Sequence, residues 1–197
     1  MPPLMRNTIA AIALIGVFAP QGAVASEKDP WNIWDQAGVH ALMRHALAPG
    51  TGDPANFPVG DCKTQRNLDE TGQNQARETG NQIRKRGIAI DTIFSSQWCR
   101  CLETAILLEL APVSEEPALN SFFRDRSTAD QQTDQLIARL NTLPKNSKMF
   151  LITHQVNITK LTGIYPRSGE IILIRLDENG TVKTLARLMA KEAPPLN

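Results

Sequence analysis

The sequence lacks an excess of charge of either sign. Its 197 residues hold 21 lysines and arginines against 20 aspartates and glutamates, which gives a formal net charge of +1. Proteins that bind nucleic acids or other polyanions carry a large surplus of basic residues. We therefore expect no nucleic-acid partner, and any anion that the chain binds must be small and held by a few placed side chains.

A long apolar run is also missing. The apolar stretch at residues 8–19 is shorter than the roughly 20 residues that a membrane-spanning helix needs. Arg6 precedes this stretch and Ala-Val-Ala at residues 23–25 follows it, in the pattern of a cleaved signal peptide. We expect residues 1–25 to be a signal peptide and residues 26–197 to form a single domain, periplasmic or secreted from a bacterium, with no stable membrane anchor after cleavage. An uncleaved anchor is the alternative.

Cysteine is scarce. Cys62, Cys99 and Cys101 are the three cysteines of the chain, and the odd number allows at most one disulfide within it. A Cys-x-Cys pair without a nearby histidine is a poor metal signature, so we expect no metal and no cofactor. In an oxidising compartment Cys62 can pair with Cys99 or with Cys101. Either bridge would pin the loop after the first predicted strand to the segment that carries Arg100.

Short apolar runs alternate with segments that favour helices. Strands are predicted at residues 39–43, 91–95, 149–153, 170–176 and 182–188. Helices are predicted between them at residues 69–86, 98–110, 130–143 and 157–162. Almost uniformly apolar strands indicate a parallel sheet covered on both faces. Asn179-Gly180 between the last two strands is a strong hairpin signal. The prediction is an α/β protein, a three-layer α/β/α sandwich with a mostly parallel central sheet and a C-terminal β-hairpin at one edge.

Basic side chains follow the predicted parallel strands. Arg44 and His45 end the first strand, Arg100 lies about five residues after the second, and His154 ends the third. Ligands of such sheets bind beyond the carboxyl ends of the strands, where helix N-termini add a positive dipole end. We therefore expect these four side chains to surround one anion.

A phosphoryl group suits such a pocket. Two guanidinium groups can clamp its oxygens in bidentate fashion and neutralise charge that other phosphatases neutralise with a metal. A neutral imidazole nitrogen is a competent nucleophile toward phosphorus near pH 7. The prediction is that His45 attacks and forms a phosphohistidine, and that a protonated His154 stabilises the transferring group. The predicted phosphate-binding residues are Arg44, Arg100, His154 and Gln155.

Three segments carry a resemblance to a known family. They are Leu42-Met43-Arg44-His45, residues 95–105 (SSQWCRCLETA) and residues 152–158 (ITHQVNI). In this order they resemble the signatures of the histidine phosphatase superfamily, whose branch 1 is phosphoglycerate mutase-like, and residues 66–76 resemble the stretch before its first helix. The resemblance runs from about Val39 to Gly163. It implies an α/β/α sandwich, His45 as the nucleophile, phosphate binding by Arg44, Arg100 and His154, and no need for a metal.

The chain departs from the family at the general acid. Many relatives have a glutamate in a Leu-Asn-Glu-like context, where this chain reads Leu119-Asn120-Ser121. Asp125 is the nearest carboxylate and becomes the predicted acid, although an ion-pair or loop role competes with that assignment. If Asp125 does not reach the substrate, good leaving groups such as phosphohistidine, acyl phosphates and aryl phosphates are favoured.

The function predicted from the sequence is hydrolysis of a phosphomonoester or phosphoramidate on a small phosphorylated substrate, through a phosphohistidine on His45. The alternative is an exported protein that binds a phosphorylated ligand and has little catalytic activity. A mutase is less favoured, because an exported protein would not normally meet the phosphorylated cofactor that a mutase needs.

Overall fold

The computed structural model describes residues 29–190, so the predicted signal peptide at residues 1–25 lies outside the described residues. The strands are β1 (His40–Arg44), β2 (Thr92–Ser95), β3 (Val113–Glu115), β4 (Met149–Thr153), β5 (Ile171–Leu176) and β6 (Val182–Leu188). The helices are α1 (Pro30–Trp34), α2 (Glu70–Lys85), α3 (Cys99–Leu108), α4 (Ala129–Asn141) and α5 (Gln155–Thr162). Within these residues no helix is both long enough and apolar enough to cross a membrane.

One six-stranded sheet runs through the molecule in the order β3-β2-β4-β1-β5-β6. Strands β3, β2, β4 and β1 are parallel to one another, whereas β5 is antiparallel to β1 and to β6. The β5–β6 pair forms the edge of the sheet, with Asn179 and Gly180 in its turn. The predicted mostly parallel sheet and its C-terminal hairpin at one edge are confirmed.

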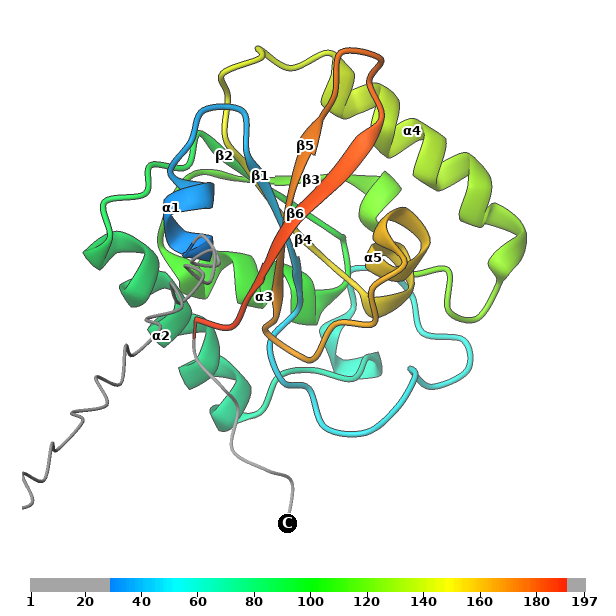
Figure 1. Cartoon of the computed structure of the whole chain (residues 1–197). Coiled ribbons are helices and arrows are strands. Elements are labelled where there is room, and N and C mark those ends of the chain that lie inside the picture. The colour runs from blue at the N-terminus through cyan, green and yellow to red at the C-terminus, as the bar shows by residue number, and fades with distance from the viewer. Residues whose placement is uncertain (1–28, 191–197) are drawn as a thin grey trace, which may run out of the picture.

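The helices form two layers, one on each face of the sheet (Figure 1). Side chains of α1, α2 and α3, such as Trp34, Ile83 and Leu108, pack on one face. Leu136 and Leu140 of α4 and Ile158 of α5 pack on the other face. Burial of these side chains holds the three layers together, and the α/β/α sandwich expected from the sequence is the fold observed.

Strand β3 and helix α1 were not predicted, and helix α3 is three residues shorter than the predicted 98–110. Strand β3 and helix α1 have three and five residues, too few to establish a period of two or of 3.6. Helix α3 ends at Leu108 because Glu109 adopts a left-handed conformation with φ of 52°. The helix therefore stops before Pro112 has any effect.

Candidate active site

Three parallel strands deliver the candidate side chains to one edge of the sheet. Arg44 at the end of β1 is in register with Thr153 at the end of β4, and Ser95 of β2 with Ile152. The backbone N–H of His45 donates to the carbonyl of Thr153 at 2.9 Å, which keeps the two strand ends side by side. Helices α3 and α5 begin at the same edge, so Arg100 lies in the first turn of α3 and Gln155 opens α5.

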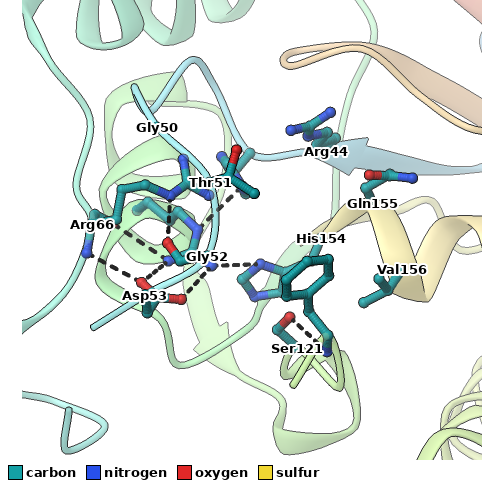
Figure 2. Close-up of a pocket in the computed structure, with 13 residues that line it drawn as sticks. Arg44, Gly50, Thr51, Gly52, Asp53, Arg66, Ser121, His154, Gln155 and Val156 are labelled. Atoms are coloured by element: carbon teal, nitrogen blue, oxygen red, sulfur yellow. Dashed lines mark hydrogen bonds and ion pairs between the residues drawn. The ribbon is translucent and has the colours of Figure 1, made fainter. Parts of the chain in front are cut away.

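A cavity of about 190 Å³ lies at this edge. Its lining includes five of the six predicted site residues, namely Arg44, His45, Arg100, His154 and Gln155. The other lining residues are Gly50, Thr51, Gly52, Asp53, Arg66, Ser121, Phe123 and Val156. Figure 2 shows the segment from Gly50 to Asp53 on one side of the cavity, and His154 and Gln155 on the other. The structure therefore brings the predicted cluster together around one space.

His45 is buried, and its two ring nitrogens have different partners. Nδ1 lies 2.7 Å from the carbonyl oxygen of Ala46, and since a carbonyl only accepts, Nδ1 carries the hydrogen. Nε2 therefore holds the lone pair, and Nε of Arg100 donates to it at 3.2 Å. Burial, followed by the charges of Arg100, Arg44 and Arg66, holds the pKa of His45 well below its ordinary value. The imidazole is thus neutral near pH 7, and its unprotonated Nε2 accepts a hydrogen bond from Arg100 at the cavity.

His154 has the opposite tautomer. Its Nδ1 accepts from the guanidinium NH2 of Arg100 at 3.3 Å, and its Nε2 donates to the hydroxyl of Ser96 at 2.9 Å. Its ring centroid lies 5.6 Å from that of His45. Burial and then the charge of Arg100 hold the pKa of His154 well below its ordinary value. Without an anion, His154 is therefore neutral, and its protonation would depend on the negative charge of a ligand.

Arg100 is almost fully buried, and one guanidinium group joins both histidines to a carboxylate. One of its edges faces His45 and His154, as described above. Its NH1 and NH2 donate to the two carboxylate oxygens of Asp53 at 2.8 and 3.1 Å. Arg100 is therefore oriented before any ligand arrives, and the edge toward the histidines points to the space that a phosphoryl group would fill.

Asp53 and Arg66 belong to the site although the sequence did not identify them. The carboxylate of Asp53 also accepts from the backbone N–H of Arg66 at 3.1 Å and from the indole N–H of Trp98 at 3.2 Å. Burial alone would raise the pKa of Asp53, but the hydrogen bonds and charge of Arg100 outweigh it and lower the pKa, so the carboxyl is ionised. Arg66 donates to the carbonyls of Gly52 and Ala48. Together they fix the loop that closes the cavity.

The charges around the cavity match those of a phosphoryl dianion. Three arginines and one aspartate line it, and with both histidines neutral they leave two positive charges. Burial, followed by the charge of Arg100, lowers the pKa of Arg66 to about 10, so this guanidinium stays protonated at pH 7. Arg44 donates through NH1 to the carbonyl of Pro166, while its buried Nε has no hydrogen-bond partner among residues 29–190. An anion in the cavity would supply a counter-charge for these groups.

The disulfide pairs Cys62 with Cys99 and leaves Cys101 as a buried free thiol. Of the two predicted pairings, the Cys62–Cys99 bridge is the one observed. It ties the loop after β1 to the first residue of α3, directly before Arg100. Burial raises the pKa of Cys101 to about 12, so the sulfur that lies 3.5 Å from Nε2 of His154 is an uncharged thiol.

Asp125 lies away from the cluster. Its side chain is exposed and accepts a hydrogen bond from the backbone N–H of Ser127 at 2.9 Å, at the start of a short 3₁₀ turn. It does not line the cavity. The structure therefore does not bring the predicted acid together with the other site residues. In the part of the chain that the structure describes, no group of three or more His, Cys, Asp or Glu side chains is arranged to hold a metal ion.

Comparison with known families and structures identifies the family and supports the fold. Residues 41–146, more than half of the chain, match the sequence model of the histidine phosphatase superfamily (branch 1). His154 lies beyond that range. A search of proteins with curated functions finds no match.

Several solved structures resemble the fold. The protein histidine phosphatase SixA complexed with tungstate is 19% identical, with a TM-score of 0.54 over 77% of this chain and 97% of that one. A phosphoserine phosphatase variant from Entamoeba histolytica with phosphoserine is 15% identical, with a TM-score of 0.55 over 78% and 98%. A phosphoglycerate mutase from Plasmodium falciparum is 16% identical, with a TM-score of 0.52 over 82% and 97%. At these identities the likeness establishes the fold alone.

Proposed function

The chain belongs to branch 1 of the histidine phosphatase superfamily, and from that premise we propose that it hydrolyses a phosphomonoester or phosphoramidate by way of a phosphohistidine on His45. The observation that carries the proposal is the tautomer of this residue. The carbonyl of Ala46 fixes the hydrogen on Nδ1, and the lone pair of Nε2 lies beside Arg100 in a cavity with two net positive charges.

The proposed reaction has two steps. In the first, Nε2 of His45 forms a bond to phosphorus while the bond from phosphorus to the leaving group breaks, and the electron pair departs with the leaving group. In the second, water attacks phosphorus, the bond to Nε2 breaks, and inorganic phosphate leaves with the imidazole restored. Arg44, Arg66 and Arg100 would stabilise the charge on the phosphoryl oxygens in both steps. In this scheme the guanidinium groups take the part that a metal takes in other phosphatases.

His154 and Gln155 complete the proposed phosphate site. Nδ1 of His154 lies against Arg100, and a bound dianion would favour its protonation because it offsets the positive charges that now lower its pKa. A protonated His154 would then donate to a phosphoryl oxygen. Gln155 at the first position of α5 adds an amide donor beside the free N–H groups of that helix.

Nothing in the geometry favours Asp125 as the general acid, because its carboxylate is exposed and outside the cavity. Asp53 is the carboxylate that lines the cavity, but its lowered pKa keeps it ionised. We therefore propose that the enzyme acts on substrates whose leaving group departs without protonation.

We also propose that the protein is exported. The predicted signal peptide at residues 1–25 and the Cys62–Cys99 disulfide both support an oxidising compartment. Cell fractionation combined with N-terminal sequencing of the mature protein would test this. A chain that keeps its first 25 residues and stays in the cytoplasm would refute it.

The decisive experiment for the function uses acetyl phosphate and p-nitrophenyl phosphate in excess EDTA, since both have good leaving groups. Turnover that His45→Ala abolishes, with an acid-labile phosphoryl group trapped on His45 by mass spectrometry, would support the proposal. Tight phosphate binding without turnover would instead support the alternative, a protein that binds phosphorylated ligands. Activity lost in EDTA and restored by a divalent ion would contradict the metal-independent scheme.

A further inference from the structure

A second cavity of about 150 Å³ adjoins the phosphate cavity. The two share Gly52, Asp53, Ser121 and Phe123 as lining residues. Phe57, Trp98 and Arg124 complete the second one. A phosphoryl group held between the two histidines would thus have its leaving group directed either to solvent or into this neighbouring space.

Aromatic rings form the wall of the second cavity. The Trp98 ring packs edge-on against His154 with centroids 5.5 Å apart, and Phe57 packs edge-on against Trp98 at 5.4 Å. The rings of His154, Trp98 and Phe57 therefore form a continuous series of contacts that begins in the phosphate cavity. Phe123, whose exposed fraction is 52%, lies where the two cavities meet. Edge-to-face and offset packing with such rings favours another flat aromatic ring.

The aromatic wall is held in place by the site itself. The indole N–H of Trp98 donates to Asp53, the same carboxylate that orients Arg100. Arg124 donates to the carbonyls of Asp53 and Pro54, and its guanidinium carbon lies 5.9 Å from the centroid of the Phe57 ring. The second cavity is therefore built on the same fixed loop as the phosphate cavity.

The chemistry of the phosphate cavity points to the same class of leaving group. Its carboxylate, Asp53, is ionised, so it has no proton to give to a departing atom. Phenols and imidazoles have pKa values near 10 and 6.5, whereas an aliphatic alcohol is about as weakly acidic as water, near 15.7. A phenol can leave as phenolate, and an imidazole that already carries a proton on its second nitrogen can leave as the neutral ring, both without a general acid in the site, while an aliphatic alkoxide cannot leave readily.

We propose that the second cavity, here called the aryl subsite, binds the leaving group and selects a flat aromatic ring that carries the phosphoryl group on a hydroxyl or a ring nitrogen. This rests on the proposed function. The bond from phosphorus to the ring atom breaks with its electron pair on that atom. A phenolate then takes a proton from water, whereas an imidazole protonated on its other nitrogen before the bond breaks leaves as the neutral ring. The volume of the aryl subsite, about 150 Å³, suits such a ring, because an apolar cavity of about the same volume in another protein binds benzene.

Binding of phosphonates tests the aryl subsite on the intact wild-type protein and does not require turnover. Benzylphosphonate, cyclohexylmethylphosphonate and methylphosphonate share the anion and differ only in the attached group. We expect benzylphosphonate to bind about tenfold more tightly than methylphosphonate and about threefold more tightly than the cyclohexyl compound. Equal affinity for all three would overturn the subsite, and equal affinity for the two ring compounds would overturn its preference for an aromatic ring.

Variants inside and outside the aryl subsite test whether the preference for an aromatic ring arises there. Phe57 lines the aryl subsite but not the phosphate cavity, so Phe57→Leu should reduce the benzyl-to-methyl ratio to less than about threefold. Tyr165→Ala is the matched control, since this aromatic ring has an exposed fraction of 71% and lines neither cavity. An unchanged ratio in Phe57→Leu would overturn the assignment.

Turnover separates the aryl subsite from the proposed function on which it rests. Phenyl phosphate and phosphorylimidazole represent the two possible sources of the ring, and acetyl phosphate reports the chemistry without a ring. A larger loss of kcat/KM in Phe57→Leu for either aromatic substrate than for acetyl phosphate supports the subsite and identifies its source. Acetyl phosphate turnover that depends on His45, without a benzyl preference in binding, refutes the subsite and leaves the function intact. No turnover of any of these substrates refutes the function.

Discussion

Strand β1 has a buried histidine at each end, and the two differ in what their ring nitrogens contact. Nδ1 of His40 accepts the backbone N–H of Met149 at 3.2 Å, so its lone pair is used in holding β1 against β4. His45 donates its N–H to a backbone carbonyl, and its Nε2 lone pair accepts from the side chain of Arg100, which lines the phosphate cavity. Burial lowers the pKa of both residues, so burial alone does not separate a structural histidine from a reactive one.

The surroundings of the two rings differ in charge as well. His40 lines a cavity with two basic residues, Lys145 and Arg175, and two acidic ones, Asp177 and Glu178. The cavity at His45 has three arginines and one aspartate. A lone pair that faces a cavity-lining side chain instead of the backbone, next to uncompensated positive charge, suits the carboxyl end of β1 to phosphoryl transfer. Four experiments would break or sharpen this contrast.

The largest effect is expected from removing the two histidines one at a time. His45→Ala should lower kcat for acetyl phosphate by about 10⁴-fold or more, because no other nucleophile replaces Nε2. His40→Asn is the control and should change kcat by less than about threefold, because its Oδ1 can accept the Met149 N–H in place of Nδ1. Steady-state kinetics with circular dichroism of both variants would measure this. Similar losses of kcat in both variants would contradict the distinction between a structural His40 and a reactive His45.

The next effect concerns the guanidinium that joins both histidines to Asp53. Lysine cannot present a planar fork, so Arg100→Lys should lower kcat/KM by about 10² to 10³-fold. Arg175→Lys makes the same exchange beside His40, and we expect it to have little effect on kcat/KM. If Arg100→Lys retained wild-type kinetics, Arg100 would have no part in orienting the phosphoryl group.

The disulfide lies at the His45 end of the molecule, where it ties the loop after β1 to the start of α3. It closes a loop with a sequence separation of 37 residues, so the Cys62→Ser/Cys99→Ser variant should lose about 2 to 4 kcal/mol of unfolding free energy. Hydrogen exchange should rise more in residues 48–66 than in the β5–β6 hairpin. Dithiothreitol should destabilise the wild type to a similar extent and have no effect on the double variant. Uniform loss of protection across the sheet would contradict a local role.

The smallest effect is the pH dependence contributed by His40. Burial lowers its pKa to about 4, although the nearby Asp91 acts in the opposite direction. Between that value and the ordinary value near 6.5, the unfolded chain binds a proton that the folded chain does not, so stability falls as the pH falls. From pH 7 to pH 5 this amounts to about 2 kcal/mol.

Denaturant unfolding at the two pH values tests this contribution. His45 and His154 have lowered pKa values and act in the same direction, so only a comparison with a variant isolates the share of His40. His40→Asn should lose about 2 kcal/mol less than the wild type between pH 7 and pH 5. Identical losses would mean that the folded protein does not hold His40 neutral.

Much of the fold was predictable because its strands are nearly uniformly apolar and its long helices have clear ends. The predicted strand 149–153 coincides with β4, and the predicted helix 69–86 is one residue longer at each end than α2. Arg44, His45, Arg100 and His154 were predictable for a related reason. Each follows a parallel strand, and the carboxyl ends of parallel strands meet at one edge.

The remaining parts of the site depend on contacts between residues far apart in the chain. Asp53 lies in a loop with no periodicity, and its role follows from Arg100, 47 positions later. The predicted acid Asp125 has a suitable chemical type, yet its loop leaves it exposed at the start of a 3₁₀ turn. Neither placement could be inferred from neighbours in sequence, since only the packed structure determines where a loop side chain points.

The sequence by itself determined the sheet, its hairpin edge and the four basic residues at the strand ends, because strand and helix periodicity are local properties of the chain. Tertiary structure decided that Cys62 pairs with Cys99, that Asp53 holds Arg100, and that Phe57 and Trp98 form the wall of a second cavity. These features require segments distant in sequence to meet at distances of a few ångströms, and that meeting is set by the packing of the whole domain.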